Sequence, residues 1–140
     1  MKPTAQLEGA GDEIAAERSA ARSWAVPYLI LQGLGIAAWW ILMWSLPEWR
    51  QPFRDPAAPW SALGAFGPAD LMCVAACLFG AWGVARRRPW RRPVLWLLAG
   101  AMVYAASYCL ALTALTGHAV AAPLLMVPAA LITLWLARGE

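Results

Sequence analysis

The sequence predicts an all-α polytopic membrane protein whose four transmembrane helices form an up-down bundle with both termini in the cytoplasm. Three observations lead to this fold class. First, 61% of the chain is hydrophobic and 14% is charged, with a mean hydropathy of +0.54, which is too much apolar surface for an ordinary soluble protein of 140 residues. Second, four long apolar segments follow one another along the chain. Third, a short loop with five arginines separates the second segment from the third.

The chain is expected to have two parts. Residues 1–23 are polar and rich in Ala, Glu and Arg, so they predict a partly helical cytoplasmic tail. Residues 24–140 are expected to form one transmembrane domain, because about 20 apolar residues in a helix cross a hydrocarbon core of roughly 30 Å. The four spans are predicted at about 26–46, 68–85, 94–115 and 120–137. Pro27 is expected in the first turn of its helix, and Pro128 is expected to kink the fourth span.

The longest connection, residues 47–67, is predicted to lie on the outer side of the membrane. Its prolines argue against regular helix, and its aromatic side chains are typical of the membrane interface. A lid over a cavity is the alternative interpretation. The prolines are Pro47, Pro52, Pro56 and Pro59, and the aromatic residues are Trp49, Phe53, Trp60 and Phe66.

The arginine loop, residues 86–93, sets the predicted orientation. Cytoplasmic loops carry an excess of Lys and Arg, so this loop is expected inside the cell, in a bacterial-type cytoplasmic (inner) membrane. The same charges are expected to contact anionic lipid headgroups, whereas nucleic-acid binding is not expected, because the basic residues flank apolar segments. The loop arginines are Arg86, Arg87, Arg88, Arg91 and Arg92; Lys2, Arg18, Arg22 and Arg138 fall on the same predicted side, and Arg50 and Arg54 on the other.

Small residues recur in the second and third spans and predict how the helices pack. Small side chains four residues apart share one helix face and let two backbones approach closely. Since a short loop joins these two spans, we expect a hairpin packed through both series. The packing residues are Ala69, Cys73, Cys77, Gly80 and Ala81 in one span and Ala101, Ala105 and Cys109 in the other. Gly33 and Ala37 form a similar notch in the first span.

The three cysteines are interpreted as small packing residues. A redox bridge between Cys109 and either Cys73 or Cys77 is an alternative. A metal site is not expected, because nothing in the apolar spans would balance the charge of thiolates. The single histidine, His118, cannot supply both axial ligands of a haem, and no cofactor is predicted.

One group of residues could line a vestibule on the outer side: Asp70, Tyr104, Tyr108, Cys109 and His118. An acid and a histidine at the same depth could handle protons. The simpler interpretation makes Asp70 a helix cap and His118 a turn residue.

The sequence does not indicate a reaction, and no residue is assigned a catalytic role. It favours a non-catalytic accessory or assembly subunit that packs against a larger membrane partner or against its own copies. The first alternative is a small lipophile-binding protein or membrane enzyme with a pocket on the outer side. The second alternative is a membrane thiol redox protein.

Cysteine labelling tests the predicted orientation. In a background with Ala at the three native cysteines, a membrane-impermeant maleimide should label Asp55→Cys in intact cells, because residue 55 lies in the connection predicted outside. The same reagent should label Arg88→Cys only after the membrane has been opened. Labelling of Arg88→Cys from outside would invert the topology.

Overall fold

A computed structural model describes the backbone of residues 4–139 and the side chains of residues 23–139. This part of the chain consists of helices joined by turns and short connections, and it contains no strand. The elements are α1 (Thr4–Ser45), the 3-10 helix η1 (Pro47–Phe53), α2 (Trp60–Gly64), α3 (Gly67–Ala85), α4 (Arg91–Thr116) and α5 (Ala121–Gly139).

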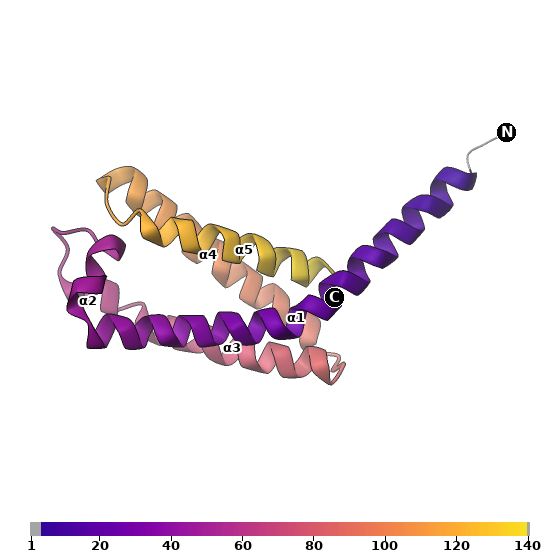
Figure 1. Cartoon of the computed structure of the whole chain (residues 1–140), viewed down its shortest axis with the longest axis horizontal. Coiled ribbons are helices and arrows are strands. Elements are labelled where there is room, and N and C mark those ends of the chain that lie inside the picture. Colours follow the sequence, from indigo (N-terminus) through magenta and orange to yellow (C-terminus); the bar gives the residue numbers. More distant parts are fainter. Residues whose placement is uncertain (1–3, 140) are drawn as a thin grey trace.

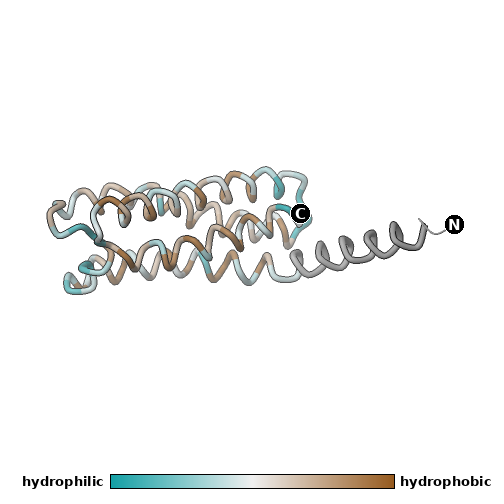
Figure 2. Tube along the Cα trace, turned by 90° about the horizontal axis from the view of Figure 1, so that it is seen from above, coloured by the Kyte–Doolittle hydropathy of each residue, from teal (hydrophilic) through white to brown (hydrophobic). Residues whose placement is uncertain are grey.

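Four helical segments are long and apolar enough to cross a membrane, and this confirms the predicted number of such helices. They are Ser23–Ser45, Trp60–Ala85, Arg91–Thr116 and Ala121–Gly139. Figure 2 shows the apolar residues along the lengths of the helices, with hydrophilic residues gathered at the connections.

Two local expectations were wrong. Pro27 was expected in the first turn of its helix, but α1 is continuous from Thr4 to Ser45 and Pro27 lies inside it. The expected tail 1–23 therefore belongs to the same helix from Thr4 onward, while the side chains of residues 1–22 lie outside the described part. The apolar span itself, Ser23–Ser45, is close to the predicted 26–46. The connection 47–67 was expected to lack regular helix, yet it contains η1 and the short α2. Its prolines fall at tolerated places: Pro47 opens η1, and Pro59 precedes α2.

The long helices pack mainly as two pairs, α1 with α3 and α4 with α5. The arginine loop joins α3 to α4 at one end of the bundle, here called the Arg-loop end, and η1, α2 and the α4–α5 turn lie at the opposite end (Figure 1). In that view the two pairs converge toward the Arg-loop end and separate toward the other. The expected hairpin of α3 and α4 is therefore not the main packing unit, although the two helices do touch.

The interface between α1 and α3 depends on glycines from both helices. A β-carbon on Gly33 would lie 3.2 Å from that of Cys77, and one on Gly80 would lie 3.6 Å from Leu29. Nearer the opposite end, the Trp40 ring lies 3.6 Å from the position of a β-carbon on Gly67. These contacts run in opposite order along the two helices, and the missing side chains allow close approach.

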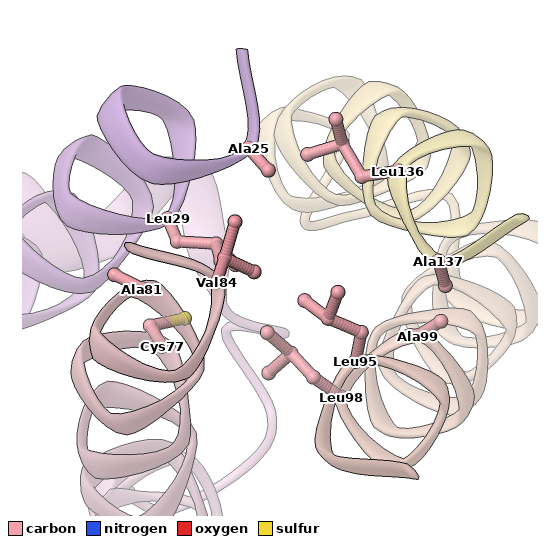
Figure 3. Packing of buried hydrophobic residues seen from close by; sticks show 10 residues of the cluster. All are labelled: Ala25, Leu29, Cys77, Ala81, Val84, Leu95, Leu98, Ala99, Leu136 and Ala137. Atoms are coloured by element: carbon pink, nitrogen blue, oxygen red, sulfur yellow. The ribbon is translucent and has the colours of Figure 1, made fainter. Parts of the chain in front are cut away.

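All four long helices contribute to one buried cluster at the Arg-loop end (Figure 3). Its residues are Ala25 and Leu29 of α1, Cys77, Ala81 and Val84 of α3, Leu95, Leu98 and Ala99 of α4, and Leu136 and Ala137 of α5. A smaller cluster of Met102, Ala106 and Ala130 adjoins Ile36 and Cys73 farther along the bundle. The tightest packing therefore lies near the arginine loop.

The predicted packing residues are buried to different degrees. Cys77, Gly80 and Ala81 are buried, whereas Ala69 is exposed. Cys73, Ala101, Ala105 and Cys109 are half-buried. The buried positions of α4 are instead Leu95, Leu98, Ala99, Met102 and Ala106. The small face of α3 meets α1, where a β-carbon on Gly33 would lie 3.2 Å from that of Cys77.

Aromatic stacking holds the end of the arginine loop, just before α4, against α3. The Trp90 ring stacks on Phe79 with centroids 4.1 Å apart and an interplanar angle of 10°, and it also lies beside Trp82. A β-carbon on Gly83 would lie 2.5 Å from the Trp90 ring, so only glycine leaves room for this ring. The loop itself turns through Arg87, whose φ is +50°.

Gly83→Ala should therefore lower the free energy of unfolding in detergent by about 1–3 kcal/mol, because the added methyl group displaces the Trp90 ring from its stack. Gly100→Ala is the matched control, since nothing lies within 4 Å of that position. We expect it to leave stability unchanged or to raise it by up to about 1 kcal/mol. Denaturant unfolding followed by circular dichroism measures both, and equal effects would contradict the assigned role of Gly83.

Candidate functional site

Asp70 lies in the first turn of α3, at the end of the bundle away from the arginine loop. Asp70 does lie in the first turn, as the expected interaction with the positive helix end requires, but its carboxylate makes no described hydrogen bond to a backbone N–H and turns toward α1. There Oδ2 accepts a hydrogen bond of 2.8 Å from the indole N–H of Trp40. Trp40 is buried and Asp70 is half-buried, so this bond joins α1 to α3 within their apolar lengths.

A chain of aromatic rings surrounds this hydrogen bond; we call it the aromatic cluster, and it consists of Trp39, Trp40, Trp44, Phe53 and Trp60. Trp40 contacts Trp39, Trp44 and Trp60 at centroid distances of 4.8, 5.9 and 6.5 Å, and Trp39 also contacts Phe53. The cluster links α1 to η1 and α2, which explains why the aromatic residues of this connection fold back onto a helix end.

The aromatic cluster already holds one cation. The Arg50 guanidinium carbon lies 4.0 Å from the centroid of Trp60, a favourable cation–π distance. Arg50 also donates from Nε to the Met43 carbonyl at 2.6 Å. Arg50 is thus used to close the end of α1, and no described cation pairs with Asp70.

The second carboxylate oxygen of Asp70 is open to the surroundings of the protein. Oδ1 of Asp70 accepts no hydrogen bond from the described residues. It is also not fully enclosed, because among the described side chains Nε of Arg54 is the polar atom that is both enclosed and without a partner. The carboxylate therefore has one oxygen bonded to Trp40 and one that accepts no hydrogen bond from the described residues.

One further residue of the predicted vestibule is linked to this end of α3 by an aromatic contact. Tyr108 contacts Phe66, one turn before Asp70, with ring centroids 5.0 Å apart. Tyr108 is thus linked through Phe66 to the turn that carries Asp70, and Cys109 is the next residue along α4.

The other two vestibule residues lie apart from this group. The Tyr104 side chain is 71% exposed on the outer face of α4, where it would meet lipid. His118 is exposed in the turn after α4, and its backbone N–H donates to the Thr116 hydroxyl at 3.1 Å. Among the described residues, neither side chain forms a hydrogen bond with Asp70.

The three cysteines are free thiols. Cys77 is buried against Gly33, in keeping with a packing residue, while Cys73 and Cys109 are half-buried. No group of three metal-ligating side chains occurs among the described residues. The loop arginines Arg86, Arg87, Arg88 and Arg92 are exposed, and the Arg88 guanidinium lies 5.7 Å from the Trp82 ring.

A second polar group, which the sequence analysis missed, joins three helices nearer the Arg-loop end. The Tyr28 hydroxyl of α1 donates to the Ala129 carbonyl of α5 at 2.9 Å and lies 3.2 Å from the Thr133 hydroxyl. The Thr133 hydroxyl lies 3.3 Å from Oε1 of Gln32, and Nε2 of Gln32 donates to the Met102 sulfur at 2.8 Å. These bonds tie α1 to α4 and α5.

The sequence carried a signal for this group. Gln32 and Thr133 are uncharged polar residues inside apolar spans, and polar groups in lipid need partners from neighbouring helices. Neither residue is ionisable, so neither was among the predicted site residues. Which residues would pair could not be read from the sequence, because it depends on the rotation of each helix.

The fold and these two polar groups define a tryptophan-rich helical protein of the integral membrane class. A scan against protein-family models and searches of curated proteins and of solved structures returned no match for the chain. Any more specific function must therefore be argued from the molecule's own chemistry.

Thr133→Val should lower the free energy of unfolding by about 1–2 kcal/mol, because it keeps the shape but removes a hydroxyl shared by two helices. Ser107→Ala is the control. The Ser107 hydroxyl bonds only to the Val103 carbonyl of its own helix, so its loss should change stability by less than about 0.5 kcal/mol. Unfolding in mixed detergent micelles measures both variants, and a neutral Thr133→Val would show that the group does not hold the helices together.

Proposed function

We propose that this chain is a non-catalytic accessory or assembly subunit of a bacterial-type inner membrane. In this proposal the four helices run up and down across the bilayer, with both termini and the arginine loop on the cytoplasmic side. The exposed arginines would then contact anionic headgroups, each worth roughly 1 kcal/mol near a charged membrane surface.

The observation that carries the proposal is the incomplete covering of α3. It contributes the least covered of the four spans, because it packs chiefly on α1 and touches α4 much less. Its outward face presents large apolar side chains around a small one: Leu71, Met72, Leu78, Phe79 and Trp82 surround Ala75, and all are exposed. Such a face fits the ridge of another membrane helix as well as it fits lipid.

The interior polar side chains support the same proposal. Tyr28, Gln32 and Thr133 are hydrogen-bonded to one another or to neighbouring helices. Polar groups that satisfy each other hold a bundle rigid, and a rigid apolar scaffold suits an assembly role.

A second candidate function is favoured by the open carboxylate oxygen of Asp70. An ionisable group within an apolar span is costly and commonly marks a binding or transport site. With Tyr108, Phe66 and the buried Trp40 nearby, this site would accept a small lipophilic molecule at the end of the bundle opposite the arginine loop.

The accessory proposal predicts a specific loss of assembly. Purified gently from its native membrane, the chain should run in a complex heavier than its own 15.2 kDa, as native mass spectrometry would show. Ala75→Trp should release the chain from this complex, because the larger ring fills the outward face of α3.

Ala111→Trp is the matched control. Ala111 is also exposed within a span, but on α4, so this variant should keep the complex. A native chain that is monomeric in mild detergent, or equal loss in both variants while the fold is retained, would contradict assembly through α3.

A further inference from the structure

We infer that Asp70 and its aromatic surroundings form a binding site for a lipophilic organic cation, such as a quaternary ammonium or phosphonium with aromatic or alkyl groups. The inference rests on the second candidate function above and names the class of its ligand. It starts from a charge that the described residues leave without a counterion.

The first step concerns the carboxylate. A half-buried carboxylate in apolar surroundings is expensive unless it is paired and hydrogen-bonded. Trp40 supplies one neutral hydrogen bond at 2.8 Å, which leaves the negative charge uncompensated. A bound cation at the accessible Oδ1 would supply the missing attraction, which is stronger there than in water because of the lower dielectric.

The second step concerns the walls of the site. Phe66 precedes Asp70 by one helical turn, and the Tyr108 ring contacts it from α4. Aromatic faces attract cations that have lost part of their water shell. The Arg50 guanidinium on Trp60, at 4.0 Å, shows that this end of the bundle accommodates such a contact.

The third step concerns access and depth. Tyr108 lies eight residues before the end of α4 at Thr116, which is about 12 Å along a helix. Leu71 and Met72, which follow Asp70, are exposed on the outside of α3. A ligand that reaches Asp70 from the side therefore passes apolar side chains, and a small hydrated cation would be a poor fit.

Equilibrium dialysis of the purified full chain in detergent tests the inference, with tetraphenylphosphonium as the cation and triphenylphosphine oxide as a neutral molecule of similar shape. The native chain should bind tetraphenylphosphonium saturably at one site. Asp70→Asn should weaken this binding by about tenfold or more, while its amide oxygen can still accept the Trp40 hydrogen bond.

Asp55→Asn is the matched control. It removes the same charge from a turn in which Oδ1 of Asp55 accepts from the Ala57 backbone N–H, and it should leave binding unchanged. Asp70→Glu should keep most of the affinity. If Asp70→Asn fails to fold, as judged by near-ultraviolet circular dichroism, the comparison of the two probes on the native chain still decides.

The possible results distinguish the cation site from the more general lipophile-binding function. Equal binding of the cation and the neutral probe would overturn the cation site but leave a site for lipophiles. Equal cation binding to Asp70→Asn and the native chain would place the ligand elsewhere. Binding of neither probe would remove both the inference and the lipophile-binding function.

Discussion

The close contact between α1 and α3 is the constraint on which the other features of this protein depend. With no side chain at Gly33, the β-carbon of Cys77 can approach α1. The same interface places Trp40 over Gly67 and directs its indole N–H to Asp70. A larger residue at position 33 would separate the helices and weaken the Trp40–Asp70 hydrogen bond about two turns away. The same helix interface thus packs the small residues and positions the Asp70 carboxylate.

Hydrogen bonding then decides how the second helix pair joins the first. Lipid offers no partners for polar groups, so side chains within the spans must find them in the protein. Tyr28 and Gln32 of α1 meet Thr133 of α5 and Met102 of α4. This group lies close to the buried cluster at the Arg-loop end, so directional bonds and close packing act together there. Apolar packing alone would leave the rotation of α5 poorly specified, since lipid and leucine are equally apolar.

The two ends of the bundle differ in kind. At the Arg-loop end, aromatic stacking of Trp90 on Phe79 presents a row of exposed arginines. At the other end, the helix pairs separate (Figure 1), and aromatic rings surround a single carboxylate with an open oxygen. Under the proposals above, the first end would contact a charged membrane surface. The second end would bind a ligand, because free charge and aromatic faces make an apolar site selective.

The amino-acid sequence alone predicts the class of protein and the four apolar helices. It also predicts that Cys77, Gly80 and Ala81 are packing residues. These properties follow from hydrophobicity and residue size, which add up locally along the chain. The sequence does not predict which helix packs against α3 or that Ala69 is exposed. It also does not predict the hydrogen bonds of Asp70 with Trp40 and of Tyr28 with Thr133. Those features depend on how each helix is rotated and on which neighbour it faces. Contacts between residues far apart in the chain decide both, above all the close approach of α3 that Gly33 allows.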